Sequence, residues 1–326
     1  MHLALADTLK VGVLGPFSVT VDGGERAVPG PKRRALLASL ALGRNGVVAV
    51  ERLIDELWEA DLPSEPRNAV QHHVVRLRSA LGPESIEALP NGYALRNAAV
   101  DATEFEQLLA AARVALRQAD PAAAEQAASR ALALWRGPAL LGLPQTAALR
   151  AHAAHLEELR VDALEERLEA ALALGRHQEV VSSAREAVDE HPLRERFWVQ
   201  LMTALYWCGR QADALEAFRR ARDVLLEELG LEPGPELRRL QQAILAHDGA
   251  VLAAASGTQA AAPVAAGPQD REESLFQVLG LLREQLRGAE ELYRQALAAA
   301  EEYVNVSAHP ELELRGAGTA ARGAAS

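Results

Sequence analysis

Residues 66–83, PRNAVQHHVVRLRSALGP, decide the fold of the N-terminal part of this 326-residue chain. We expect a helix that opens at Ser64, has Pro66 in its first turn and ends at Leu81-Gly82-Pro83, since glycine can adopt a left-handed cap and proline cannot continue a helix. Its apolar residues recur at a helical period and should pack inward: Val70, Val74, Leu77 and Leu81.

The opposite face of this helix contains no acidic residue. Its members are Asn68, Gln71, His72, Val75 and Ser79, flanked by Arg76 and Arg78. These polar side chains can hydrogen-bond to bases or phosphates, and Val75 suits contact with a thymine methyl group. A solvated helix on an acidic protein normally mixes both signs of charge, so this face favours a nucleic-acid contact. We expect Arg76 and Arg78 to face solvent in the absence of DNA.

The sequence on either side of this helix predicts a small sheet, two further helices and a terminal hairpin. Residues 9–29 alternate apolar and polar positions and close at Asp22-Gly23-Gly24, which is typical of an antiparallel meander. Helices are predicted over 31–42, with Gly43 as the stop, and over 51–60, with a short strand at 47–50 between them. The segment IEALPNGYALR predicts two strands around Pro90-Asn91-Gly92. In such a unit one helix fits the major groove of DNA while the hairpin reaches an adjacent groove.

Other cations could complete a phosphate-binding surface around that helix. They are Lys32, Arg33, Arg34, Arg67 and Arg96. The alternative is that Lys32 to Arg34 form only a solvated first turn, although cations there oppose the helix dipole by a few tenths of a kcal/mol each. His72 and His73 point about 100° apart on a helix, which disfavours a shared metal. Hydrogen bonds to phosphates or base edges are the better interpretation of both histidines.

Composition excludes several classes of protein. Apolar residues make up 49% of the chain and aromatic residues only 4%, which favours a mainly helical fold. The single cysteine, Cys208, excludes an internal disulfide and a thiolate metal cage. Residues 1–98 carry 11 Lys and Arg and 11 Asp and Glu, so the net charge of −11 falls entirely on residues 99–326. We find no signal peptide or membrane span and expect a cytoplasmic protein.

From residue 100 to about 250 the pattern is helical and repetitive. Small or apolar residues recur in three sets, Ala124/Ala128/Ala131, Val180/Ala184/Ala187 and Ala214/Phe218/Ala221. The last two sets lie 34 residues apart, which is the tetratricopeptide period. The first set lies 56 residues before the second, so an insertion near 137–147 should separate them. We expect three stacked helical hairpins, forming a short tetratricopeptide-like solenoid.

The remaining residues predict a linker, a helix and a tail. Residues 251–274 are rich in Ala, Gly and Pro and are typical of a flexible linker. Positions 275 to 303 keep an apolar seam in alternating steps of four and three, which indicates an amphipathic or coiled-coil helix over 275–305. That helix either self-associates or packs on the chain's own solenoid. A disordered tail is expected over 306–326.

Several long motifs resemble a known family. LKVGVLGPFSV, GPKRRALLASLAL, VERLIDELW, NAVQHHVVRLRSALG and NGYALR are similar to an OmpR-type winged-helix domain over 1–98. The continuation over 99–250, which includes VDATEFEQLL and LEELGLEPGPELRRLQQAIL, looks like the bacterial transcriptional activator domain. Together they resemble the Streptomyces antibiotic regulatory protein family. The resemblance implies an activator that binds direct repeats at promoters, contacts RNA polymerase holoenzyme and controls a secondary-metabolite gene cluster.

The resemblance also assigns roles to single residues. The family's recognition helix falls on Asn68 to Leu81, where His73, Arg76 and Arg78 match positions that grip phosphate or bases. In the hairpin, Asn91, Tyr93 and Arg96 match the wing. Valine at position 75 makes fewer hydrogen bonds than its counterparts, so operator preference does not transfer. No P-loop motif occurs, and we expect no nucleotide or other cofactor.

Two other interpretations remain open. An enzyme has little support, because His152, His155 and Glu158 are a weak metal pattern and no nucleophile constellation is present. The second is an interaction scaffold whose winged helix no longer reads DNA. Binding to promoter DNA that weakens with salt would separate an activator from a scaffold. If the seam over 275–303 mediates self-association, its loss should weaken binding to tandem sites most.

Overall fold

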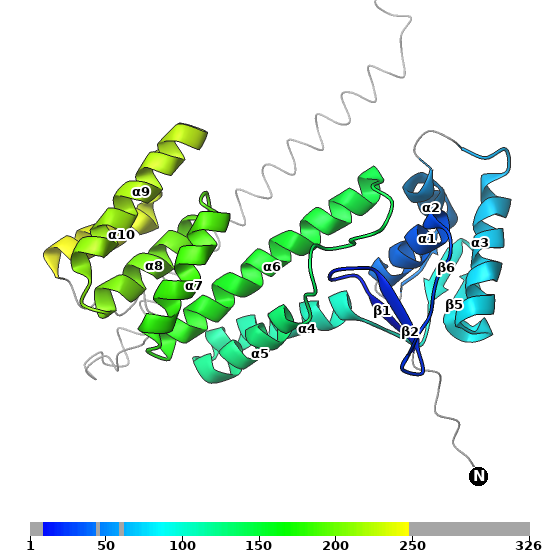
Figure 1. Cartoon of the computed structure of the whole chain (residues 1–326), viewed down its shortest axis with the longest axis horizontal. Coiled ribbons are helices and arrows are strands. Elements are labelled where there is room, and N and C mark those ends of the chain that lie inside the picture. The colour runs from blue at the N-terminus through cyan, green and yellow to red at the C-terminus, as the bar shows by residue number, and fades with distance from the viewer. Residues whose placement is uncertain (1–8, 44–45, 59–61, 248–326) are drawn as a thin grey trace, which may run out of the picture. The chain divides into compact units, whose positions relative to one another are not determined.

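The N-terminal part is a winged helix that begins with a small sheet (Figure 1). The computed structural model describes residues 9–43, 46–58 and 62–247. Strands β1 (Leu9–Gly12), β2 (Ser18–Val21) and β3 (Gly24–Glu25) form the expected antiparallel meander, with Val11 opposite Val19. Asp22 and Gly23 have φ angles of 53° and 78°, which make the tight turn between β2 and β3. A fourth strand, β7 (Ala98–Val100), pairs in parallel with β1.

Three helices and a second sheet complete the winged helix. The helices are α1 (Pro31–Leu42), α2 (Val50–Leu57) and α3 (Pro66–Leu81). The second sheet has the order β4 (Val48–Ala49), β6 (Gly92–Leu95) and β5 (Ile86–Leu89), and a 3-10 turn at Pro83–Ser85 leads into it from α3. A Cβ atom at Gly92 would lie 2.1 Å from the carbonyl oxygen of Val48, so the close pairing of β4 and β6 requires glycine there.

The start of α3 differs from the prediction by two residues. The helix begins at Pro66 rather than Ser64, and Glu65 before it has a φ of −128° and a ψ of 76°. Proline disfavours the helical conformation in the residue that precedes it, which explains the later start. The helix ends at Leu81 as expected. Gly82 has a positive φ of 108°, but its ψ of 145° lies outside the left-handed helical region expected for the cap.

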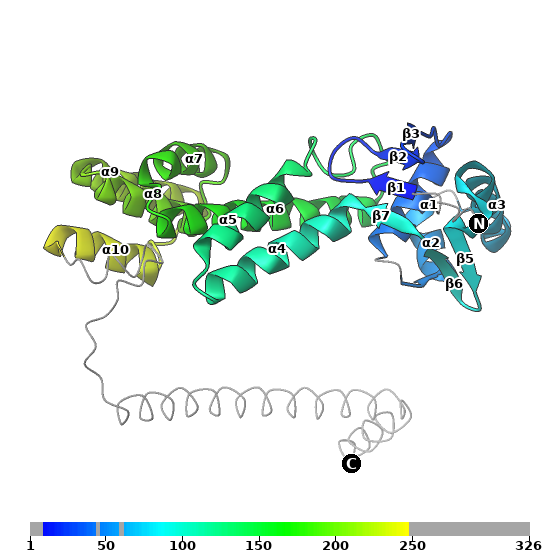
Figure 2. The same cartoon turned by 90° about the horizontal axis from the view of Figure 1, so that it is seen from below.

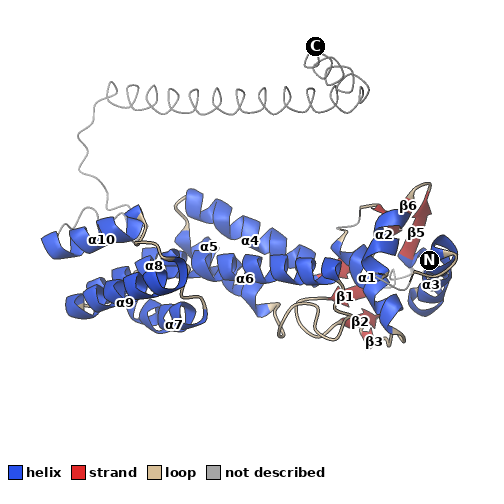
Figure 3. Cartoon of the chain, turned by 90° about the horizontal axis from the view of Figure 1, so that it is seen from above, coloured by secondary structure: helices blue, strands red, loops and turns tan. Residues whose placement is uncertain are grey.

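The rest of the described chain is helical, and Figure 3 shows strands only in the winged helix. The helices are α4 (Asp101–Arg117), α5 (Pro121–Ala133), α6 (Ala147–Ala173), α7 (His177–Glu190), α8 (Glu195–Trp207), α9 (Gln211–Leu229) and α10 (Pro235–Ala246). The three predicted sets lie in α5, α7 and α9, and all nine side chains are buried. The mainly α-helical class with a winged helix and helical hairpins is therefore confirmed.

The predicted insertion is the connection between α5 and α6, residues 134–146, which we call the strap. It returns to the first sheet and forms a parallel bridge between Leu141 and Pro16. The amide of Leu140 donates to the carbonyl of Val13 at 2.8 Å, and the amide of Phe17 donates to the carbonyl of Leu141 at 2.9 Å. The strap therefore extends the winged helix with residues that come from the helical repeats.

Two large hydrophobic cores organise these elements, with the division between them in α6, and a small third cluster of Ala115, Ala124 and Ala170 joins α4, α5 and α6. The first core contains the apolar face of the winged helix and continues through Phe105 and Leu109 of α4, Leu140 of the strap and Leu156 of α6. The second core extends from Val161 to Ile244 and holds α7 to α10 together. Figure 2 shows α4 continuing from β7 and packing beside α5 and α6. The expected division between residues 98 and 99 thus crosses a continuous core.

The predicted linker at 251–274, the helix at 275–305 and the tail at 306–326 lie outside the described residues. Among the residues that are described, no helix is both long and apolar enough to cross a membrane.

Candidate nucleic-acid interface

The outward side of α3 is open to solvent, and we call its residues Gln71, His72, Val75, Arg76 and Ser79 the outer face. The four apolar residues on the other side are at most 3% exposed, which fixes the rotation of the helix. Val75 is 50% exposed, and all members of the outer face are exposed. In the described part of the chain, Arg76 is exposed and has no hydrogen-bond or ion-pair partner. All three views place α3 on the side of the winged helix away from α6.

Arg78 does not face solvent as expected. Its side chain is half-buried, and Nε donates a hydrogen bond to the carbonyl oxygen of Ile86 at 2.9 Å. Ile86 is the first residue of β5, so Arg78 connects α3 to the hairpin that forms the wing. The expectation of a free Arg78 is wrong because a backbone carbonyl eight residues further along the chain takes up its donor.

The cations at the start of α1 are also half-buried. Lys32 donates to the carbonyl of Leu57 and lies 5.6 Å from the ring centroid of Trp58, so it caps the end of α2. Nε of Arg34 is buried and has no acceptor among the described residues. Arg33 lies beside Gly30, the residue before the helix. This first turn is therefore packed against α2 and is more than a solvated end.

His73 lies between α2 and α1 rather than on the outer face. Its ring stacks on that of Trp58 with centroids 6.2 Å apart. Burial lowers the pKa of His73, and electrostatic interactions with Arg33, His72 and Lys32 lower it further. The folded environment therefore favours the neutral imidazole of His73, whereas His72 is exposed beside it.

Two residues at the start of α3 have acidic neighbours. Arg67 forms an ion pair with Glu51 of α2, and the Asn68 amide donates to the carboxylate of Glu65. Both Arg67 and Asn68 are exposed, so a phosphate can compete with these carboxylates for them.

The wing presents a mixed set of side chains. Asn91 is exposed at the hairpin turn, and its carbonyl accepts from the amide of Val50 at 3.1 Å. Tyr93 is half-buried against the first core, opposite Val48 in the sheet. Arg96 pairs with Glu87 across the hairpin at 2.7 Å. The structure thus places all predicted DNA-binding residues in one domain, but several of them already make contacts within the protein.

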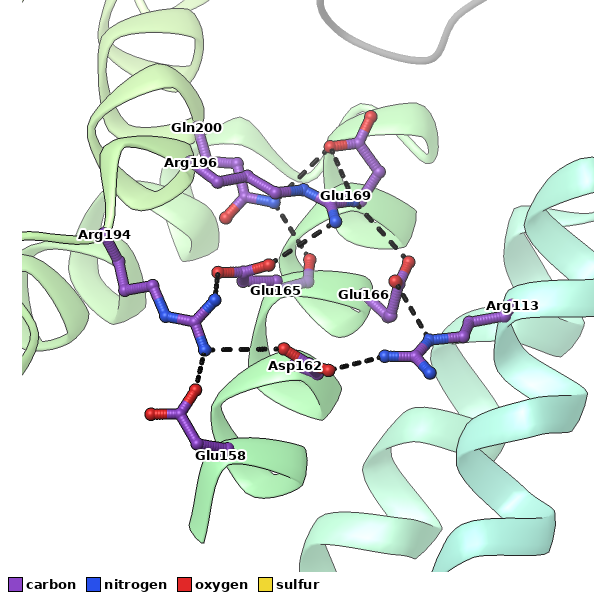
Figure 4. A network of polar contacts seen from close by, with 9 residues as sticks. All are labelled: Arg113, Glu158, Asp162, Glu165, Glu166, Glu169, Arg194, Arg196 and Gln200. Atoms are coloured by element: carbon purple, nitrogen blue, oxygen red, sulfur yellow. Dashed lines mark hydrogen bonds and ion pairs between the residues drawn. The ribbon is translucent and has the colours of Figure 1, made fainter. Parts of the chain in front are cut away.

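The helical repeats contain a second group of arginines, and Figure 4 shows these in contact with carboxylates of α6. Arg196 lies 3.4 Å from Glu165, and Arg113 of α4 lies 2.7 Å from Asp162. Arg194 pairs with Glu158 and also approaches Asp162 at 3.6 Å. Burial raises the pKa of Glu165 although Arg196 and Arg194 lower it. We call these arginines, together with the carboxylates of α6 that they contact, the α6 network.

The sequence does not predict which side chains join the winged helix to the repeats, although Asp101 lies in the motif VDATEFEQLL. Asp101 accepts hydrogen bonds from the amides of Val13 at 2.8 Å and Leu14 at 3.1 Å, and it pairs with Arg136 of the strap at 2.9 Å. The insertion expected near residues 137–147 corresponds to the strap, but its pattern does not predict the contacts of the strap with the first sheet.

A second junction lies between α2 and α6. Glu56 is 5% exposed, and its Oε1 lies 2.6 Å from Nε of Arg52 and 3.9 Å from Nε2 of His152. Burial raises the pKa of Glu56, but its interactions with the neighbouring His152, Arg52 and Ser39 side chains outweigh burial and lower the pKa to about 2. His152, considered above for a weak metal pattern, instead belongs to this contact.

Comparison with known proteins gives two family matches in the same order as the domains. The bacterial transcriptional activator domain matches residues 100–245, and the C-terminal domain of transcriptional regulatory proteins matches residues 24–95. The regulatory protein AfsR of Streptomyces coelicolor is 39% identical over 253 residues, which are 77% of this chain and 25% of AfsR. The chain therefore spans about a quarter of that relative.

Two further relatives match over more of their length. The transcriptional regulator RedD of Streptomyces coelicolor is 37% identical over 74% of this chain and 71% of RedD. A solved structure of Mycobacterium tuberculosis EmbR, in complex with a low-affinity phosphopeptide, has a TM-score of 0.70 and 35% identity over 76% of this chain and 69% of that chain. AfsR, RedD and EmbR are all named as regulatory proteins. The chain belongs to the Streptomyces antibiotic regulatory protein family of transcriptional regulators.

Proposed function

We propose that this chain is a transcriptional activator that binds direct repeats in promoter DNA through α3 and the wing. The observation that carries the proposal is the outer face of α3, which is exposed and free of acidic residues on a chain with a net charge of −11. A phosphate-lined groove repels acidic surfaces, so a regulator of this net charge needs one surface from which acids are absent. Membership of the family supports the same assignment.

The side chains divide into base-reading and phosphate-binding groups. Arg76 has its donors available, and a free guanidinium reads guanine through its O6 and N7 atoms. Val75 offers an apolar contact to thymine. Around them, Arg67, Arg96 and the cations of α1 contribute positive charge near the backbone, and Arg78 orients the wing rather than reading a base.

The first test is DNA binding and its dependence on salt. Footprinting of the full chain on DNA upstream of its own gene and neighbouring genes gives the site and its repeat spacing. Fluorescence anisotropy on that site should then show that the logarithm of the binding constant falls with the logarithm of salt concentration with a slope of about −4 to −5. This is the value expected when the protein neutralises about four to six phosphates and releases their counterions. Loss of preference for that site over a scrambled duplex at every salt concentration would support the scaffold interpretation instead.

We propose further that the bound activator recruits RNA polymerase holoenzyme and controls a secondary-metabolite gene cluster. The support is membership of a family that includes relatives named as regulatory proteins of Streptomyces. In transcription reconstituted with the holoenzyme and the footprinted promoter, the full chain should raise transcript yield. A protein that protects the site and leaves the yield unchanged would contradict recruitment without contradicting DNA binding.

A further inference from the structure

The helical repeats contain a groove of about 740 Å³ where the end of α5, the middle of α6 and the α7–α8 connection meet. Ligand sites for small molecules typically enclose about 300–1,000 Å³. The apolar part of its lining consists of Leu132, Val161, Leu164 and Leu193. Leu193 is 43% exposed although it lies beside other apolar side chains, so this groove leaves apolar surface accessible.

The carboxylates that line the groove are already engaged or point to solvent. Glu157 accepts a hydrogen bond from the amide of Ala139 at 2.7 Å, and Glu158 pairs with Arg194. The side chain of Glu190 is 75% exposed, with His191 at 4.0 Å. Little negative charge therefore remains to be satisfied by a ligand.

Two of the lining arginines retain unused hydrogen-bond donors. Arg167 lines the groove and has no ion-pair or hydrogen-bond partner among the residues that the structure describes. Arg160 lies with its guanidinium carbon 4.9 Å from the ring centroid of Trp135, and its ion-pair contact with Glu157 is 3.6 Å long. Stacking on Trp135 orients the Arg160 guanidinium without consuming its N–H groups.

We propose that this groove binds a small organic anion, with an apolar body held against Leu164 and Leu193 and one acidic group held by Arg160 and Arg167. The groove also adjoins the strap, because Glu157 holds Ala139 and Arg160 covers Trp135. A ligand held by Arg160, beside Glu157 and Trp135, should therefore stabilise the strap, which joins the repeats to the first sheet. The site belongs to the repeats and requires no DNA, so its test is independent of the proposed function.

The test uses 8-anilinonaphthalene-1-sulfonate, an apolar anion whose fluorescence rises in apolar sites, with the full chain. We expect saturable binding of one probe per chain and displacement by decanoate at lower concentrations than by 1-decanol. Arg167→Gln and Arg160→Gln should each weaken binding about tenfold, since each loses a charge-assisted contact. Arg185→Gln is the matched control, because Arg185 is an exposed arginine of α7 outside the groove.

The outcomes separate this site from general binding to apolar surface. Leu193→Asn, at an exposed position, should weaken the anionic probe and the neutral analogue N-phenyl-1-naphthylamine alike, whereas the arginine variants should affect the anionic probe alone. Decanoate should also slow hydrogen exchange at the Ala139 amide. Non-saturating binding, equal affinity for Arg167→Gln and Arg185→Gln, or unchanged exchange at Ala139 with decanoate bound would overturn the proposal.

Discussion

The outer face of α3 and the α6 network use arginine in opposite ways. Arg76 is exposed, with no acidic residue beside it on that face. Arg194 and Arg196 each lie within 4.0 Å of three carboxylates, all of them on α6. The first region leaves a positive charge available for an external anion, whereas the second consumes its positive charge in joining helices. The distribution of acidic residues, which are absent from the outer face of α3, is therefore more informative about a nucleic-acid partner than the net charge of −11.

The largest expected effect is on folding, from Arg196→Ala in the α6 network. Glu165 is 5% exposed and would lose its contact with Arg196 at 3.4 Å. Removal of one partner from a buried pair costs about 3–5 kcal/mol, and partial exposure of Arg196 brings our expectation to about 2–3 kcal/mol of unfolding free energy. Urea denaturation measures it. Arg219→Ala, which removes an exposed pair with Glu216, is the control and should cost at most about 0.5 kcal/mol.

The second prediction tests the free arginine of α3. Arg76→Ala should reduce affinity for the footprinted site by about 1–3 kcal/mol and leave the urea midpoint unchanged, because the side chain has no described partner in the unbound protein. Arg78→Ala should instead lower stability by about 1 kcal/mol as well as affinity, since it removes the hydrogen bond to Ile86. If the two variants behave alike in both assays, the distinction between reading and positioning is wrong.

A smaller effect concerns the apolar member of the outer face. Val75→Ala should cost about 0.5–1 kcal/mol of affinity if the side chain covers a thymine methyl group. Replacement of thymine by deoxyuridine at each position of the site identifies that base by anisotropy. At that position deoxyuridine should weaken binding by the wild type but cause no further loss for Val75→Ala, because the variant and the modified base remove the same contact. Additive losses at every thymine would exclude the contact.

The smallest effect is the pH dependence of the α6 network. Burial raises the pKa of Glu165 in the folded state, so folding favours the protonated form. Its contribution to stability is therefore present below the unfolded pKa and is lost as pH rises through the folded pKa. Between pH 4 and 7, Glu165→Gln should show a weaker fall of Tm with rising pH than wild type. Calorimetry at several pH values checks this, and parallel curves would contradict the sign.

The sequence predicted the face of α3 well because amphipathic periodicity determines which side chains point inward. It also located the repeat helices, since Ala184 and Ala221 are small for the same packing reason. It could not predict the partner of Arg78, because that partner is a backbone carbonyl and leaves no side-chain pattern. Nor could it predict the contacts of Asp101, whose carboxylate accepts hydrogen bonds from amides almost ninety residues earlier in the chain.

The strap has a consequence for fragments of this protein. A piece that ends at residue 98 would lose Asp101, whose carboxylate accepts from the amide of Val13. It would also lose Leu140, whose amide donates to the carbonyl of Val13. Peptide groups that lose their hydrogen-bond partners in this way promote aggregation or pairing with strands of other molecules. The smallest autonomous piece that includes α3 therefore extends into α6, and excision at the boundary suggested by homology would deliver an incomplete domain.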